Sequence, residues 1–236
     1  MSKLEQLTIA TYLDHFDCIN IFTYKPILFN NWKFNSKIHI YNASDIIPES
    51  EKFYYTGNGD CPTQSVVGFS DIFRYKMLYN IGDWYSDFDV ACLKPYTFTE
   101  NDTVIRSHEK YTSISNICKF KKNDEVLIDL YNTTKNHVTE NNAQWDTPLD
   151  IFNKTIHKYG YEKYIVKEYL GTDNFNKTIN PLIAGSIIDV DLTNTYAIHW
   201  CRSAITTGNW SSCHYYDTDN PFPGTVLNYL YSKYNI

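Results

Sequence analysis

Residues 68–95, GFSDIFRYKMLYNIGDWYSDFDVACLKP, constrain the fold more than any other part of the chain. Apolar residues cover more than one side of residues 64–80, which is the pattern of a buried helix, and Gly82 ends it. Asp71 and Arg74 lie three residues apart, so they share one face of this predicted helix. Charged groups on a buried helix must pair or face a polar cavity. The pattern leaves open whether these two form an ion pair that only stabilises the core or belong to a site.

The Asp-Phe-Asp triplet that follows predicts a metal site. Residues 83–90 have the pattern of a strand, in which residues two apart point to the same side, so Asp87 and Asp89 would present their carboxylates together. Adjacent carboxylates repel each other unless a cation lies beside them. Their hard oxygen atoms favour Mg²⁺ or Mn²⁺. The alternative is a pair of ordinary strand-end carboxylates, because an isolated DxD often occurs by chance.

The rest of the chain alternates helical and strand patterns, which predicts an α/β fold. No internal repeat or linker divides it, so we expect a single domain over residues 1–236, with its ligand- and metal-binding core at about 64–95. Residues 49–63 are expected to form a surface loop. Further helices are predicted at residues 3–15, 124–133 and 149–159, and strands at residues 18–24, 37–41, 103–106, 113–119 and 195–200.

Composition excludes some classes of partner. The 236 residues are 43% apolar, enough for a buried core, and no apolar run is long enough to span a membrane. The 21 basic and 27 acidic residues give a net charge of −6, without the basic stripe of a nucleic-acid-binding protein. A small phosphorylated ligand can still bind an acidic protein when a metal ion supplies local positive charge.

The cysteines indicate a cellular compartment. None of the six forms a CxxC pair or a zinc-like spacing with histidine, so we expect free thiols and a cytoplasmic location. Several Asn-x-Ser/Thr sequons, such as that at Asn42, keep a secretory lumen as the alternative. Aromatic residues make up 17% of the chain, and their rings either fill the core or line a carbohydrate site.

The segment after the last predicted strand is polar and bounded by aromatic residues. The strand at 195–200 carries His199, and residues 202–210 follow it as a predicted loop that ends at Trp210. Such a loop could fold over a ligand or form a surface excursion, and the sequence leaves both open.

Residues 69–95 resemble the sugar-binding region containing the DXD motif of glycosyltransferases, in the capsular-polysaccharide and mannosyltransferase-like group related to clostridial glucosylating toxins. The pattern of that group is approximately S-D-x-x-R-Y-x-x-L-Y-x-x-G-G-x-Y-x-D-x-D-V, and nearly all of it is present here. The resemblance is looser at residues 4–26, 43–48 and 197–200.

The resemblance implies a GT-A glycosyltransferase fold, a Rossmann-like mixed sheet flanked by helices, with Mn²⁺ or Mg²⁺ bridging the diphosphate of a nucleotide sugar. Carried over, Asp71 and Arg74 would hold sugar hydroxyls and ribose or phosphate oxygens. Asp87 would contact ribose or sugar and metal-bound water, and Asp89 would ligate the metal directly. The C-terminal metal or diphosphate partner would be His199. Donor-binding contacts are also expected from Tyr85 and Trp210.

The implied function is a metal-dependent glycosyltransferase that moves a hexose from a UDP- or GDP-sugar to a hydroxyl of a glycan or other acceptor, as in polysaccharide biosynthesis, with retention of anomeric configuration. The alternative is a catalytically inactive nucleotide-sugar-binding or assembly subunit. A hydrolase that uses Asp87 and Asp89 as its acid/base pair is disfavoured, because residues two apart in one strand are poorly placed to flank a glycosidic bond.

The chain departs from the group's pattern in three places. The strand that carries an aromatic residue ahead of the first helix is expected to be absent, so the sheet would lack its usual first strand. Gly82-Asp83 replaces Gly-Gly, a change that is tolerable if residue 83 has a negative φ. Residues 146–148, Asp-Thr-Pro, replace the T-G-P often found on the acceptor side.

Overall fold

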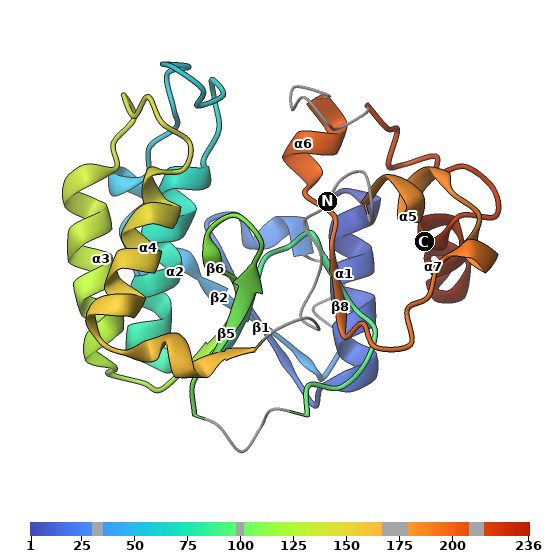
Figure 1. Cartoon of the computed structure of the whole chain (residues 1–236), viewed down its shortest axis with the longest axis horizontal. Coiled ribbons are helices and arrows are strands. Elements are labelled where there is room, and N and C mark those ends of the chain that lie inside the picture. The colour runs from blue at the N-terminus through green and yellow to red at the C-terminus, as the bar shows by residue number, and fades with distance from the viewer. Residues whose placement is uncertain (30–34, 98–101, 167–178, 208–214) are drawn as a thin grey trace.

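The computed structural model describes residues 1–29, 35–97, 102–166, 179–207 and 215–236 (Figure 1). Its α-helices are α1 (Lys3–His15), α2 (Val67–Ile81), α3 (Glu125–His137), α4 (Thr147–Lys158), α5 (Asn180–Ala184), α6 (Arg202–Thr207) and α7 (Val226–Tyr234). Its strands are β1 (Ile19–Thr23), β2 (Ile38–Asn42), β3 (Asp83–Ser86), β4 (Val90–Cys92), β5 (Val104–His108), β6 (Thr112–Phe120), β7 (Ile165–Val166) and β8 (Ala197–His199). Short 3₁₀ turns occur at Pro26–Phe29, Ala43–Asp45, Glu49–Glu51, Tyr161–Tyr164 and Ile187–Asp189.

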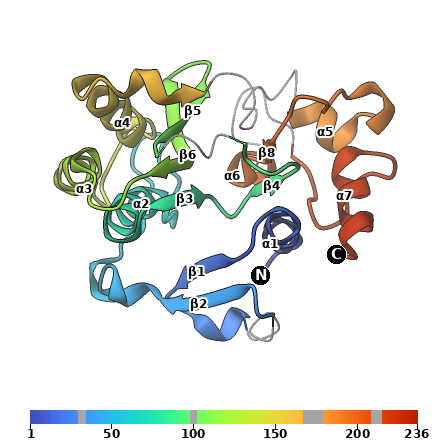
Figure 2. The ribbon, with the colours of Figure 1, turned by 90° about the horizontal axis from the view of Figure 1, so that it is seen from below.

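The described strands form three separate hydrogen-bonded groups (Figure 2). In the largest, ordered β3-β6-β5-β7, the first two pairings are antiparallel and β5 runs parallel to β7. Strands β1 and β2 pair in parallel, and β4 pairs antiparallel with β8. The expected mixed α/β architecture with helices beside the strands is confirmed.

Helices α2, α3 and α4 form a layer against β3 and β6 (Figure 1). Their core contains the stacked rings of Tyr75 and Phe152, whose centroids lie 6.1 Å apart, together with Leu78, Cys118 and Leu127. Burial on more than one side of α2 is what its apolar pattern predicts. It places Asp71 and Arg74, each 5% exposed, inside the protein.

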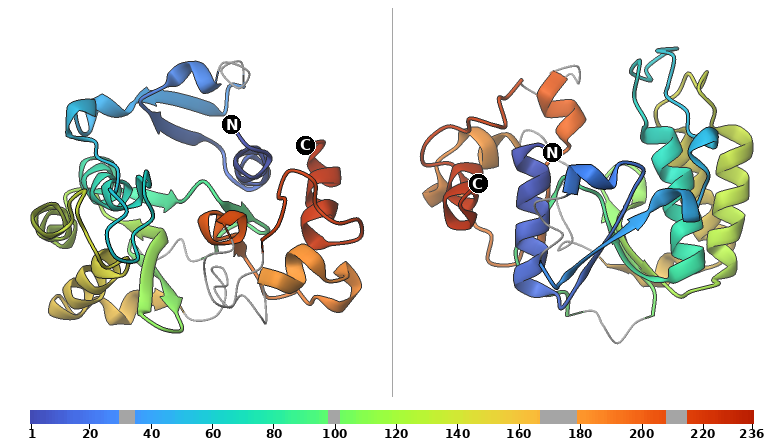
Figure 3. Two further views of the ribbon diagram at one scale, coloured as in Figure 1. Left: turned by 90° about the horizontal axis from the view of Figure 1, so that it is seen from above. Right: turned by 180° about the vertical axis from the view of Figure 1, so that it is seen from behind.

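A second core lies between α1, β8, α5, α6 and α7, and Figure 3 shows both chain ends on this side. Trp200 and Leu4 are fully buried at its centre. Helix α1 begins with a capping box, in which the Ser2 hydroxyl accepts from the Glu5 N–H and the Glu5 carboxylate accepts from the Ser2 N–H. The capping box therefore fixes the residue at which α1 begins, and α1 packs against α7.

Helix α1 also supplies hydrogen-bond partners to the edge of β4. The Thr8 hydroxyl donates to the main-chain oxygen of Phe88 over 3.1 Å, and the Cys92 N–H donates to the Thr11 hydroxyl over 3.0 Å. Because backbone polar groups that are buried must find partners, these threonines stabilise the edge of β4 that faces α1, while β8 pairs with β4.

The prediction of one continuous strand over residues 83–90 is wrong. The chain forms β3, turns at Phe88 and Asp89, and continues as β4 in a different sheet. The reason is that the two halves have different partners: β3 pairs with β6, whereas Val90 pairs with His199 of β8. Asp87 and Asp89 thus lie at a turn between two strands. The directions of their side chains are set by this turn and not by the alternation of side chains along a strand.

Other predictions differ from the structure at element ends. The helix expected at residues 64–80 begins at Val67, residues 202–207 form α6 where a loop was expected, and α7 is an element beyond those predicted. Asp83, which replaces a glycine of the family pattern, has φ +72° and is therefore in a left-handed conformation. The replacement was expected to be tolerable at a negative φ, and this condition is not met.

None of the described helices is long and apolar enough to cross a membrane. Among the described residues, Cys18, Cys61, Cys92, Cys118 and Cys201 are free thiols, as expected. The cytoplasmic location stays a prediction.

Candidate active site

Arg74 on α2 connects the helix to the Asp-Phe-Asp turn. Its Nη1 lies 2.7 Å from Asp71 Oδ1 and donates to Ser115 Oγ of β6 over 2.5 Å, while its Nη2 lies 2.8 Å from Asp87 Oδ1. The side chains of Arg74 and Asp71 are 6% and 8% exposed. The ion pair between Asp71 and Arg74 therefore exists, and the same guanidinium also positions a carboxylate of the turn.

Tyr85 makes the second contact to Asp87. Its hydroxyl donates to Asp87 Oδ1 over 2.6 Å, and the guanidinium carbon of Arg74 lies 4.7 Å from the centre of its ring. Burial raises the pKa of Tyr85 well above its ordinary value and the Asp87 charge adds to this, so the phenol remains a donor. Asp87 Oδ2 accepts no hydrogen bond from the described residues, and the side chain is 26% exposed, which leaves this oxygen for a ligand.

Asp89 lies where the turn meets β8 and α6. Its main-chain oxygen accepts from the Trp200 N–H and its Oδ2 from the Arg202 N–H, both over 2.9 Å, and its Oδ1 lies 3.5 Å from His199 Nε2. Burial by itself would raise the pKa of this carboxyl. The charge of His199 and the hydrogen bonds from His199 and Arg202 outweigh burial and lower the pKa of Asp89. The carboxylate is thus held in its charged form.

Asp87, Asp89 and His199 fit a divalent cation. Each offers one ligand atom, and these three atoms lie within 4.8 Å of one another. Two carboxylate oxygens suit Mg²⁺ or Mn²⁺, and an imidazole nitrogen is a common metal ligand. The turn and β8 come from distant parts of the chain, so the fold completes a ligand set of which the triplet supplies only two members.

Asp71 has an unusual pKa for a carboxyl beside an arginine. Burial raises it, the Arg74 charge lowers it and the Asp87 charge raises it again, and the result is a pKa of about 6. Burial dominates because the Asp71 side chain is almost without solvent contact. The carboxyl is protonated in mild acid and ionised at neutral pH.

This raised pKa predicts a pH-dependent contribution to stability. In metal-free protein the unfolded chain releases the Asp71 proton near its ordinary pKa of 3.8, whereas the folded chain keeps it until about pH 6. The folded state binds the extra proton in this range. The stabilisation that this proton gives to the folded state is therefore present in acid and is lost as the pH rises from 4 to 7. Relative to Asp71→Asn, the free energy of unfolding of the wild type should fall by about 2 kcal/mol over this range. Urea unfolding at several pH values measures the difference, and two parallel curves would contradict the prediction.

The structure brings most of the predicted site residues together. Asp71, Arg74, Tyr85 and Asp87 form one hydrogen-bonded network, and Asp89 and His199 complete the carboxylate and imidazole cluster. Trp210 lies outside the described residues.

Two residues at the site were not predicted as site residues. Ser115 accepts a hydrogen bond from Arg74, and Arg202 donates one to Asp89. The sequence offered a signal only for Arg202, which closely follows His199 in a polar segment.

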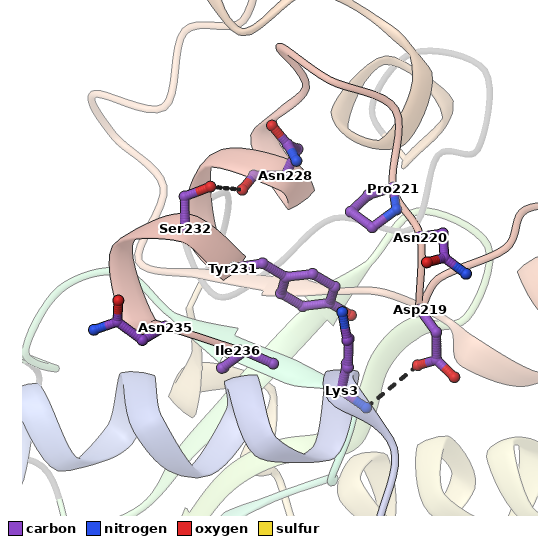
Figure 4. A pocket seen from close by; sticks show the side chains of 9 residues that line it. All are labelled: Lys3, Asp219, Asn220, Pro221, Asn228, Tyr231, Ser232, Asn235 and Ile236. Atoms are coloured by element: carbon purple, nitrogen blue, oxygen red, sulfur yellow. Dashed lines mark hydrogen bonds between the residues drawn. The ribbon is translucent and has the colours of Figure 1, made fainter.

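The described structure also has an open pocket of about 380 Å³ between α1 and α7. Figure 4 shows Lys3, Asp219 and Tyr231 among the side chains around it. None of its lining residues belongs to the network of Arg74 or to the Asp-Asp-His cluster. The candidate active site is therefore recognised by its charges and hydrogen bonds, whereas this pocket is a separate surface feature.

Comparison with known proteins relates these observations to a family. Among solved structures, a chain titled PaToxG Glycosyltransferase is 14% identical with a TM-score of 0.47, and the match covers 67% of this chain and 64% of that chain. No curated protein matches the chain. Residues 27–112 match the family described as glycosyltransferase sugar-binding region containing DXD motif, and this span includes Asp71, Arg74, Asp87 and Asp89. The chain therefore contains a glycosyltransferase-type sugar-binding region.

Proposed function

We propose that this protein is a metal-dependent glycosyltransferase that moves a hexose from a UDP- or GDP-sugar to a hydroxyl of a glycan or other acceptor. The observation that carries the proposal is the Asp87, Asp89 and His199 cluster, joined through Asp87 to the buried Arg74. Three of these four residues lie within the matched sugar-binding region. The family match supports the donor class, and the cluster supports the requirement for metal.

In this proposal the residues of α2 address the donor sugar. Arg74 orients Asp71 and Asp87 through its two terminal nitrogens. Asp71, ionised at neutral pH, accepts hydrogen bonds from sugar hydroxyls, and the second oxygen of Asp87 faces the ligand. These carboxylates are held by the protein before the ligand arrives, so little ordering cost remains at the moment of binding.

Asp87, Asp89 and His199 would hold Mn²⁺ or Mg²⁺. When bound, the ion supplies positive charge that stabilises the negative charge developing on the diphosphate as it leaves. The proposed transfer breaks the bond between the anomeric carbon and a diphosphate oxygen, which keeps the electron pair. The acceptor hydroxyl oxygen forms the new bond to that carbon, and its proton passes to the departing diphosphate. We propose retention of configuration and assign no covalent nucleophile.

A screen of nucleotide sugars by thermal unfolding with and without Mn²⁺ tests this function. A true donor binds only the folded state and stabilises it by about 2.7 kcal/mol at a hundred times its dissociation constant. Stabilising donors are then incubated with Mn²⁺, and release of the sugar is followed by NMR, which also reports the anomer formed. Binding without turnover would favour the inactive binding subunit, and no metal-dependent shift with any UDP- or GDP-sugar would refute the proposed donor class.

A further inference from the structure

A nucleoside diphosphate would bring more negative charge to a candidate active site that already holds three carboxylates. Asp71, Asp87 and Asp89 bring three carboxylates, while Arg74 is engaged by two of them. A divalent cation would offset this negative charge, but a nucleoside diphosphate adds its own. Charges placed together in a partly buried site require compensation. The compensating group should lie near Asp89 and His199, on the side of the cluster away from Arg74.

Arg202 is fixed in that position by its backbone. It is the first residue of α6, three residues after His199 at the end of β8, and its N–H donates to Asp89 Oδ2 over 2.9 Å. This contact does not involve its side chain. The backbone of Arg202 therefore stays beside the cluster whichever group its guanidinium contacts. The Arg202 side chain is 43% exposed.

Among the described residues, this guanidinium forms an ion pair with Glu5 on α1. Arg202 Nη1 lies 2.7 Å from Glu5 Oε1, and the Glu5 side chain is 26% exposed. The other carboxylate oxygen of Glu5 accepts from the Ser2 N–H over 2.6 Å, within the capping box of α1. A partly exposed ion pair contributes little net free energy, so an arriving anion can exchange with it. Glu5 itself stays in place, because the capping box holds it.

We propose that Arg202 binds the diphosphate of the donor and that Glu5 occupies its guanidinium until the nucleotide arrives. On binding, the guanidinium leaves the Glu5 carboxylate and pairs with phosphate oxygens, for which its planar set of donors is well suited. Glu5 thus competes with the ligand and lowers its apparent affinity. This inference rests on the proposed function, since the anion is the diphosphate of the proposed donor.

The test measures binding of UDP and of GDP, each with Mn²⁺, by calorimetry. In Glu5→Gln the side chain keeps an acceptor for the Ser2 N–H, because Gln also serves in capping boxes, but it loses the charge that holds Arg202. We expect this variant to bind the nucleotide two- to fivefold more tightly, which corresponds to loss of a partly exposed ion pair. Arg202→Gln should bind about tenfold more weakly, and the double variant should match it. Binding of Mn²⁺ alone should change less than about twofold in all three.

A matched control lies at the other end of the same helix. Asp14 of α1 lies 3.8 Å from Lys233 Nζ and accepts from the Tyr234 hydroxyl over 2.7 Å, both on α7. Asp14→Asn removes a comparable charged contact between helices away from the cluster. Its nucleotide affinity should equal that of the wild type.

The outcomes separate this inference from the proposed function. If the wild type binds the Mn²⁺ nucleotide and both single variants stay within about twofold of it, Arg202 does not bind diphosphate and the inference is wrong, while the donor proposal stands. Weaker binding by Glu5→Gln would show that the pair only joins α1 to α6, which also overturns it. If neither nucleotide binds the wild type, both proposals fail. Should Arg202→Gln fail to fold by circular dichroism, Arg202→Lys and Glu5→Gln decide the question.

Discussion

Replacing Asp89 with Asn is expected to lower metal-dependent turnover of the donor by at least about a hundredfold. Asn preserves the size of the side chain and an oxygen that accepts from the Arg202 N–H. It removes the negative charge, however, and a neutral amide oxygen is a weaker ligand for a hard cation than a carboxylate. Calorimetric titration with Mn²⁺ and initial rates across metal concentrations would show this loss. The rate should recover only partly at high Mn²⁺.

The control for this prediction is Asp83→Asn. Asp83 lies in the same stretch of sequence and is exposed, and its φ of +72° is one that Asn adopts readily. It does not belong to the Asp-Asp-His cluster. This variant should retain wild-type turnover. Metal-dependent turnover by Asp89→Asn within about tenfold of the wild type would mean that the cluster is not the metal site.

The second large effect is expected from Arg74→Met. Met has a similar length and no charge, so Asp71 and Asp87 lose the cation that lies 2.7 and 2.8 Å from them. Removing one partner from a buried ion pair leaves an uncompensated charge and costs about 3 to 5 kcal/mol. Urea unfolding at pH 7 should show a loss of this size, and donor turnover should fall because both carboxylates lose their orientation.

Lys158→Met is the comparison for a pair on the surface. Lys158 Nζ lies 2.6 Å from Asp129 Oδ2, but the two side chains are 64% and 25% exposed. Solvent screens such pairs, so this variant should lose far less stability than Arg74→Met. Equal losses in the two variants would contradict the role assigned to Arg74, because burial would then add nothing to the cost of breaking the pair.

Local patterns in the sequence predicted the parts of the site that depend on neighbours along the chain. Asp71 and Arg74 share a face because both lie on α2, and their burial follows from the apolar residues around them. The family resemblance added His199. Contacts between distant segments were harder to predict: the break between β3 and β4 follows from pairing with β6 and β8, which lie later in the chain.

Some elements were missed although a signal was present. Helix α7 begins after Thr225, whose hydroxyl accepts from the Asn228 N–H, and Val226, Leu227 and Leu230 are buried on one face. This is an ordinary capped amphipathic helix.

Helix α6 had no such pattern, because its polar residues resemble those of a loop. The contact of Ser115 with Arg74 arises only from the packing of β6 against α2 and has no signal in either segment alone.

The hydroxyl contacts between α1 and β4 provide a reporter for the position of this helix. The Cys92 N–H of β4 donates to the Thr11 hydroxyl of α1 over 3.0 Å. Its exchange with solvent deuterium therefore requires α1 to move away from the strand, without the rest of the sheet opening. Because Glu5 belongs to the same helix, the protection factor of this single amide follows the state of the segment that faces Arg202.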